Sequence, residues 1–337
     1  MKVTQVAAAS TRSRHSWMDF LRGFAILLVI AFHSTKMLSR VDLMPPMWLK
    51  DATEFFALYR MPTLMFLSGL LLPQSLKKDT VTYFTGKIRS VLWPYLVWSG
   101  VTALVFSRDV SSIQAIVSLL NAGSYLWFLF FIGLFYGFAY FVKRVNPLAI
   151  AVVAFVVAVA ALFASKGIQV QSRMFYLMSY FFLGAFVARH WDAFLTFVDK
   201  RTSLVAVLIA ILGGIAAAYF DLKSQPMAVP VVFAFIVGAC YLSRKVADKP
   251  WAQLPNYVGQ NSLKFYVSHF PAIYLFDVLG TQLGLEHSGV LAVLSIFVAL
   301  AVGMIFSVAS EKSVAVQWLF SAPKFQGSRF RRPPAAI

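Results

Sequence analysis

Long stretches without Asp, Glu, Lys or Arg recur along this chain, and they limit its possible folds more than any other feature. Four of them are Val145 to Ser165, Thr202 to Phe220, Ser224 to Ser243 and Ser288 to Ser310. A helix needs roughly 20 apolar residues to cross the hydrocarbon core of a bilayer, and each stretch is close to that length. The sequence therefore predicts an all-α protein, a polytopic bundle of transmembrane helices.

Apolar runs and helical spacing predict about ten spans along the chain. They are centred on Phe20 to Met37, Phe55 to Pro73, Val91 to Ser107, Tyr125 to Val142, Leu148 to Phe163, Phe175 to Ala188, Leu204 to Phe220, Met227 to Ser243, Ser262 to Gly280 and Gly289 to Ser310.

The positively charged residues indicate the orientation. With a cytoplasmic N-terminus, most of the 30 Lys and Arg residues fall in the termini and inner loops, as the positive-inside rule requires. An even number of spans then places both termini in the cytoplasm. We expect one integral-membrane domain over residues 1–320 and a basic, disordered cytoplasmic tail over residues 321–337. The segment Val110 to Asn121 is too short to span and is expected along the outer interface.

The net charge of +17 does not indicate a nucleic-acid-binding protein. Lys and Arg occur in short clusters between apolar runs, and do not gather with aromatic residues on one polar domain. The one cysteine, Cys240, lies inside an apolar run and can form no internal disulfide. The sequence thus excludes nucleic acid as a partner, indicates membrane lipid, and predicts a multi-pass protein of the inner (plasma) membrane.

Ionisable side chains inside spans are costly and by default mark function, and here they concentrate in the first, second and ninth spans. The first span has Arg22 near its cytoplasmic end and His33 near its outer end. Eleven helical residues make about three turns plus 20°, so both side chains face the same way, about 16 Å apart along the axis. They can line one channel; alternatively, Arg22 reaches the inner headgroups and His33 only ends the span.

The first span contains an acidic residue, the sequence LRG, an apolar stretch and a His, with ten residues between Arg22 and His33. This pattern resembles the first-span signature of acyltransferase family three, a family of integral membrane O-acyltransferases. Four further segments are similar to that family in order and spacing: RMPTLMFLSGLLL (60–72), KIRSVLWPYLVW (87–98), YLWFLFFIGLFY (125–136) and GQNSLKFYVSHFP (259–271). Arg60 stands where the family more often has His or another neutral residue, and Tyr125 where a His is frequent.

The resemblance implies that His33 is the catalytic residue. An imidazole suits the removal of a hydroxyl proton because its ordinary pKa lies near the working pH. Whether His33 deprotonates the acceptor or is itself acylated for a time stays open. The implied co-substrate is acetyl-CoA or a related acyl-CoA, with no bound cofactor. The implied acceptor is a hydroxyl of a cell-envelope glycan, glycolipid or exported sugar.

Arg22, Lys87 and Arg89 are the expected donor-binding residues, because the phosphates of coenzyme A call for Arg and Lys on the cytoplasmic side. Lys87 and Arg89 also fit ordinary positive-inside anchoring. Asp19 lies one turn before Arg22 and is expected to position it by pairing.

Five residues of later spans are expected to support the site or bind the acceptor: Arg60, Ser68, Trp127, Asn261 and His269. Arg60 can hold an anionic group of the acceptor or extend to the outer headgroups, and Trp127 is expected at the outer interface. Pro62 with Ser68 and Gly69 permits an opened, closely packed helix there.

Other polar and small residues have competing interpretations. His269 and Asp277 in the ninth span form either a proton relay or a buried polar pair. Gly133 and Gly137 are four residues apart, which favours close packing of two helices. The sequence contains no metal-ligand cluster and no phosphate-binding loop, so no metal is expected.

Two functions of other classes remain open. Ten spans with Arg and His near opposite faces can form the pathway of a transporter or a flippase for an envelope precursor. The chain can also be a structural subunit of an envelope-biosynthesis complex, for which these polar residues are dispensable. Acyl transfer that depends on His33 separates the enzyme from both.

Overall fold

The computed structural model describes residues 2–106, 125–164, 169–220, 222 and 226–323, and these residues form helices without any strand. The predicted interfacial segment Val110 to Asn121 and most of the predicted tail lie outside the described residues. The α-helices are α1 (Lys2–Leu38), α2 (Met47–Phe55), α3 (Arg60–Leu70), α4 (Leu72–Leu76), α5 (Thr80–Lys87), α6 (Trp93–Val105), α8 (Trp127–Phe141), α9 (Pro147–Ala164), α10 (Gln169–Arg189), α11 (Trp191–Val198), α12 (Ser203–Tyr219), α13 (Val229–Val246), α14 (Gln253–Gln260), α15 (Ser262–Gln282), α16 (Ser288–Lys312) and α17 (Val314–Gln317). Three short 3-10 turns (Ser39–Val41, Pro226–Ala228 and Pro250–Ala252) and the π-helical turn η2 (Ile88–Leu92) complete the described elements.

The described helices confirm an all-α membrane protein. Five segments are long and apolar enough to cross a membrane: Ser16–Val41, Met47–Leu76, Thr80–Val105, Pro226–Val246 and Ser288–Lys312. A sixth is the pair Ser172–Arg189 and Trp191–Val198, if this pair, bent by 101°, is one span. The other predicted spans coincide with the shorter apolar helices α8, α9 and α12 and with the more polar α15. The count of ten spans and the orientation of the termini stay predictions.

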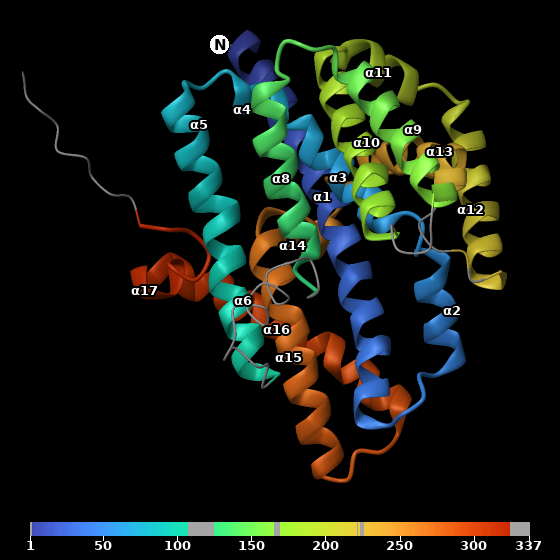
Figure 1. The fold of residues 1–337 in the computed structure, drawn as a ribbon, viewed down its shortest axis with the longest axis vertical. Helices are drawn as coiled ribbons and strands as arrows, with labels where there is room; N and C mark the ends of the chain where they lie inside the picture. The colour runs from blue at the N-terminus through green and yellow to red at the C-terminus, as the bar shows by residue number, and fades with distance from the viewer. Residues whose placement is uncertain (1, 107–124, 165–168, 221, 223–225, 324–337) are drawn as a thin grey trace, which may run out of the picture.

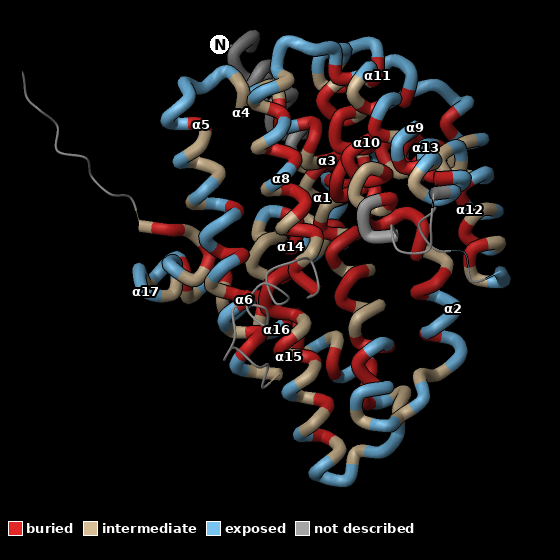
Figure 2. Tube along the Cα trace, in the orientation of Figure 1, coloured by how far each residue is buried: buried red, intermediate tan, exposed pale blue. Residues whose placement is uncertain are grey.

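Helix α1 runs through the middle of the bundle and contacts helices from both halves of the chain (Figure 1). Its neighbours include α2 and α3 on one side and α13, α14, α15 and α16 on others. Residues near this centre are mostly buried, whereas peripheral helices such as α12 contain many exposed residues (Figure 2). Those of α12 include the apolar residues Leu204, Val205 and Leu208. Because lipid solvates such apolar surfaces, a membrane bundle can leave them outward.

Glycines set two close backbone contacts in the bundle. A Cβ on Gly23 would lie 1.8 Å from the carbonyl oxygen of Pro255, and one on Gly259 would lie 1.8 Å from that of Asp19. The glycine of the LRG sequence therefore lets α1 and α14 touch through their backbones. A Cβ on Gly69 would lie 1.9 Å from the carbonyl oxygen of Phe181 in α10. This confirms the predicted small-residue contact. Only residues without a side chain permit this approach.

Candidate active site

Two histidines from opposite ends of the chain meet in the bundle. His33 of α1 and His269 of α15 have ring centroids 5.1 Å apart, with planes inclined by 40°. Phe270 packs edge-on against His33, with centroids 5.0 Å apart. The helices bring together the two histidines that the sequence placed in separate candidate roles.

The hydrogen bonds of these rings leave two nitrogens available. Nδ1 of His269 lies 3.2 Å from the carbonyl oxygen of Phe265, one turn back along α15. Nε2 of His269 and Nδ1 of His33 are both buried without a hydrogen-bond partner. If Nδ1 of His269 carries the proton and donates it to Phe265, Nε2 keeps a lone pair. A buried ring nitrogen of this kind can accept a hydrogen bond from the neighbouring imidazole.

Tyr125 holds α15 at the histidine pair. Pro271 lies inside α15 and has no N–H, so the carbonyl of Val267, four residues earlier, lacks its helical donor. The hydroxyl of Tyr125 donates to this carbonyl at 2.5 Å, and the hydroxyl of Tyr266 donates back to the carbonyl of Tyr125 at 2.7 Å. Tyr125, which stands where the family often has His, therefore supplies the hydrogen bond that Pro271 cannot donate. Its ring centroid lies 5.8 Å from that of His269.

His33 lines a cavity of about 240 Å³. Its walls come from α1, α3, α8, α10, α15 and the adjoining turns, and its lining residues are Val29, Phe32, His33, Ala57, Arg60, Met61, Tyr125, Trp127, Arg173, Leu177 and Tyr266. The cavity brings together His33, Arg60 and Trp127 from three different predicted spans.

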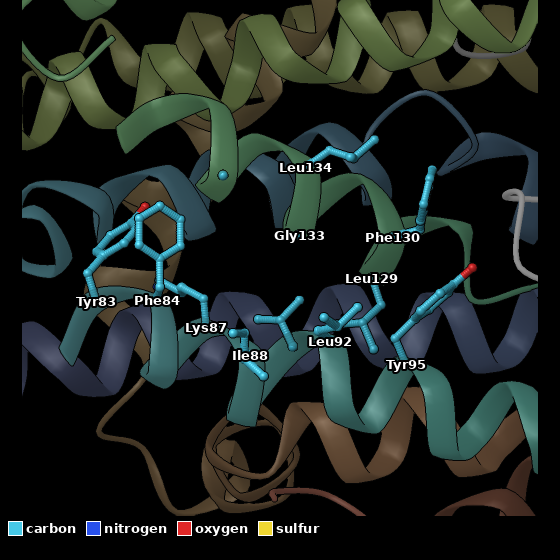
Figure 3. A pocket seen from close by; sticks show the side chains of 12 residues that line it. Tyr83, Phe84, Lys87, Ile88, Leu92, Tyr95, Leu129, Phe130, Gly133 and Leu134 are labelled. Carbon is cyan, nitrogen blue, oxygen red and sulfur yellow. The ribbon is translucent and has the colours of Figure 1, made fainter. Parts of the chain in front are cut away.

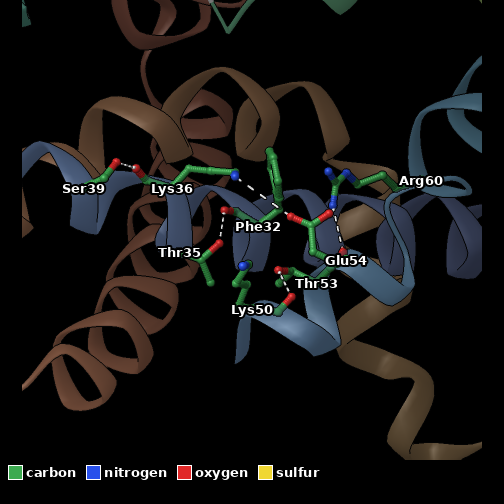
Figure 4. Close-up of polar contacts among 8 residues, drawn as sticks. All are labelled: Phe32, Thr35, Lys36, Ser39, Lys50, Thr53, Glu54 and Arg60. Atoms are coloured by element: carbon green, nitrogen blue, oxygen red, sulfur yellow. Dashed lines mark hydrogen bonds and ion pairs between the residues drawn. The ribbon is translucent and has the colours of Figure 1, made fainter. Parts of the chain in front are cut away.

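Arg60 is buried in this cavity wall, with only 8% of its surface exposed. Its guanidinium lies over the ring of Phe32, 3.7 Å from the centroid, and Nη1 donates to the carbonyl of Thr53 at 3.3 Å. Glu54 interacts with it electrostatically and also lies 4.0 Å from Nζ of Lys36 (Figure 4). This burial places the Arg60 side chain inside the bundle, and its role in binding the acceptor stays a prediction.

Trp127 and Arg173 form another part of the wall. The Arg173 guanidinium lies 4.4 Å from the ring centroid of Trp127, and Nε of Arg173 is buried without a hydrogen-bond partner. Trp127 thus lines the cavity at the start of α8, in addition to any contact with the interface. Sequence reasoning missed Arg173, because a cation near the end of an apolar span resembles an ordinary anchoring charge.

The other end of α1 carries the first of the expected donor-binding residues. Arg22 donates to Asp19 at 3.0 Å, which confirms the predicted pairing. Nζ of Lys87 lies 3.3 Å from the ring centroid of Tyr136 and 3.1 Å from Oγ of Ser75. Arg22 interacts electrostatically with the same tyrosine. Tyr136 of α8 thus has Lys87 over its ring and also interacts electrostatically with Arg22.

Ser68 belongs to the same region through its backbone. The Tyr136 hydroxyl donates to the Ser68 carbonyl at 3.1 Å, while Oγ of Ser68 donates back to Leu64 within α3. Helix α8 has residues at two places in this region: Trp127 lines the His33 cavity, and Tyr136 interacts electrostatically with Arg22. That Arg22 and His33 face the same way stays a prediction.

Two expected site residues lie elsewhere. Nε of Arg89 donates to the carbonyl of Ala322 at 2.9 Å, so the C-terminal segment holds its side chain. Asn261 accepts from Nζ of Lys264 at 3.0 Å and lines a separate polar cavity of about 510 Å³ at the start of α15. Asp277, in turn, accepts a short hydrogen bond from Ser295 of α16 and does not pair with His269.

An apolar groove has both Lys87 and Tyr95 in its lining (Figure 3). Its walls are α5, η2 and α6 on one side and α8 on the other, and Gly133 and Gly137 lie on its α8 wall. A Cβ on Gly137 would meet no atom within 4 Å, and one on Gly133 would make only an ordinary contact, 3.6 Å from Val91. The predicted close packing at this glycine pair is therefore wrong, because the pair faces a groove and not a neighbouring backbone.

The described residues contain no group of three or more His, Cys, Asp or Glu that could hold a metal ion. The arrangement instead offers an imidazole pair at a small cavity and cations at both ends of one helix.

Comparison with known proteins identifies the family of this chain. Residues 15–311 match the sequence profile of acyltransferase family three, described as an acyltransferase domain. No curated protein and no solved structure matches the chain. The matched range includes His33, Arg60, Trp127 and His269. The chain therefore belongs to acyltransferase family three, and it is a membrane-embedded acyltransferase.

Proposed function

We propose that this protein transfers an acetyl or other short acyl group from cytoplasmic acyl-CoA to a hydroxyl of a cell-envelope glycan, a glycolipid or an exported sugar. The observation that carries the proposal is His33 in the wall of a cavity, at one end of a helix whose other end carries Arg22. Arg22 interacts electrostatically with Tyr136, and Lys87 lies over the ring of the same tyrosine. One helix thus joins a candidate phosphate site to a candidate base.

The donor binds at the Arg22 end. Arg22 and Lys87 supply positive charge for the phosphates of coenzyme A, since charge-assisted hydrogen bonds to phosphate are the strong ones. About 16 Å of helix separates Arg22 from His33, and an extended pantetheine arm spans a comparable length. The thioester then reaches the His33 cavity without release of a free acyl group.

The acceptor binds in the cavity, where His33 takes its hydroxyl proton. The acceptor oxygen attacks the thioester carbonyl, the carbon–sulfur bond breaks, and the departing thiolate of coenzyme A receives the proton from His33. The products are the O-acyl ester and free coenzyme A, so atoms and charges balance.

His269 acts as a positioning residue for His33. Nδ1 of His269 donates to the Phe265 carbonyl, and Nε2 accepts from Nδ1–H of His33 once the two rings align. This fixes the tautomer of His33 so that its Nε2 is the base, since the hydrogen bond at one ring nitrogen decides the state of the other.

The test is acyl transfer in inside-out vesicles, where added acyl-CoA meets the cytoplasmic face. Radiolabelled acetyl-CoA is supplied to vesicles with and without the protein, and the envelope glycans and lipids are separated and counted. Label in a hydroxyl-linked, base-labile ester only where the protein is present is the expected result. Unlabelled glycans and lipids, with movement of an intact envelope precursor across the membrane, would instead indicate a transporter or a flippase.

A further inference from the structure

The His33 cavity has two arginines in its wall, Arg60 from α3 and Arg173 from α10. Each guanidinium lies over an aromatic ring, 3.7 Å from the Phe32 centroid for Arg60 and 4.4 Å from the Trp127 centroid for Arg173. A guanidinium carries five N–H donors in its plane, and a ring face is at best a weak acceptor for them. These contacts therefore position the two groups and leave most of their donors for a ligand.

The charges around the cavity do not balance. Glu54 interacts with Arg60 and also lies 4.0 Å from Lys36, so one carboxylate serves two cations (Figure 4). The cavity lining contains no Asp or Glu, and within the part of the chain that the structure describes Arg173 has no ion-pair partner. Removing a cation from water is costly unless an anion accompanies it. An anionic ligand would offset this cost.

The two tyrosine hydroxyls of the wall are engaged by the protein. The Tyr125 hydroxyl donates to the Val267 carbonyl, and the Tyr266 hydroxyl donates to the Tyr125 carbonyl. In contrast, Nε of Arg173 is buried without a partner. The arginines are therefore the cationic groups of this wall with hydrogen-bond donors to spare.

We propose that the acceptor carries an oxyanion, a carboxylate or a phosphate, which binds to Arg173 and Arg60 while its hydroxyl faces His33. The inference rests on the proposed acyl transfer, and it names the class of acceptor. The cavity of about 240 Å³ is smaller than the roughly 300–1,000 Å³ of most small-molecule sites. It suits a single anionic sugar unit, with the rest of a larger acceptor outside.

Three sugars that differ only at carbon 6 test this inference directly. Methyl glucuronide carries a carboxylate there, methyl glucoside 6-phosphate a phosphate, and methyl glucoside a neutral hydroxyl. Equilibrium binding of each is measured with the full-length protein in lipid nanodiscs. We expect the wild type to bind at least one of the two anions about tenfold or more tightly than methyl glucoside, and the preferred anion identifies the oxyanion.

Variants of α10 assign the preference to Arg173. Arg173→Gln is expected to remove the preference for the anion, and Arg189→Gln, at the exposed far end of the same helix, is expected to keep it. Arg60→Gln tests the second arginine and should weaken the same preference, so the inference stays testable if the Arg173 variant does not fold. Equal binding of all three sugars to the wild type, or an unchanged preference in both cavity variants, would overturn the inference.

The binding assay needs no catalysis, so the two proposals can fail separately. A wild type that prefers the anionic sugars but transfers no acyl group contradicts the proposed function alone. A wild type that acylates neutral and anionic acceptors equally, and binds them equally, contradicts the anionic acceptor alone.

Discussion

His33 and His269 lie with ring centroids 5.1 Å apart, although α1 and α15 stand near opposite ends of the chain. Each ring has one buried nitrogen without a hydrogen-bond partner. The pair gives the candidate base a neighbour that can hold its tautomer, and the backbone carbonyl of Phe265 anchors that neighbour. A single histidine in this membrane-embedded bundle would lack a neighbour that holds its tautomer.

Replacing His269 should lower the rate of transfer without preventing binding. His269→Phe removes the acceptor for Nδ1–H of His33, and we expect kcat to fall by about 10- to 100-fold with little change in KM for acyl-CoA. His269→Gln keeps a polar group and should retain more activity than His269→Phe. The pH profile of kcat/KM should shift in both variants, which loss of packing alone would not cause. Equal activity of the wild type and His269→Phe would remove His269 from the site.

Donor affinity should depend on Lys87 and not on Arg89, two residues away. Lys87→Gln is expected to raise KM for acyl-CoA about tenfold, the loss of about 1.4 kcal/mol, because Lys87 lies over the ring of Tyr136, with which Arg22 interacts electrostatically. Arg89→Gln is the matched control, since Arg89 donates to the Ala322 carbonyl, and it should leave KM unchanged. Initial-rate measurements give both KM values. A higher KM for Arg89→Gln than for Lys87→Gln would place the donor phosphates near the C-terminal segment.

The Tyr125 hydroxyl should stabilise the protein because α15 contains Pro271. Tyr125→Phe leaves the buried carbonyl of Val267 without a donor, at an expected cost of about 1–3 kcal/mol in the free energy of unfolding. In a Pro271→Ala background, the restored N–H of residue 271 can bond that carbonyl, so the same change should cost less. A double-mutant cycle by thermal unfolding in detergent measures the difference. Equal costs in both backgrounds would contradict this explanation.

Two glycine replacements should have opposite effects on stability. Gly23→Ala drives a Cβ to 1.8 Å from the Pro255 carbonyl and should destabilise the protein by about 3 kcal/mol or more. Gly137→Ala adds a methyl group where no atom lies within 4 Å, and should stabilise α8 by roughly 0.5–1 kcal/mol. Melting temperatures of both variants check the assignment, and a large loss for Gly137→Ala would mean that α8 packs closely there.

Local pattern was enough to predict part of the site. Charge-free stretches indicated the helices, and the one-turn spacing of Asp19 and Arg22 indicated their pairing, which the structure confirms. These predictions depend on residues within a few turns of one another. The same pattern placed Gly69 at a close helix contact, which the approach to Phe181 confirms.

Contacts between distant helices could not be read from one sequence. The meeting of His33 with His269 depends on how α1 and α15 cross, and the role of Arg173 depends on its approach to Trp127. The spacing of Gly133 and Gly137 gives their common face but not what that face meets, which is why close packing was predicted where a groove lies. The burial of Arg60 likewise depends on how the helices pack around it.

The most direct test of His33 as the catalytic base compares His33→Ala with His190→Ala in the vesicle transfer assay, with acyl-CoA binding measured in parallel. His190 is exposed after α10, away from the cavity lining, and provides the matched control. We expect His33→Ala to lower kcat by about 10²- to 10⁴-fold and to keep the affinity for acyl-CoA, while His190→Ala keeps both. Full transfer by a folded His33→Ala protein would contradict the role of His33 as the base.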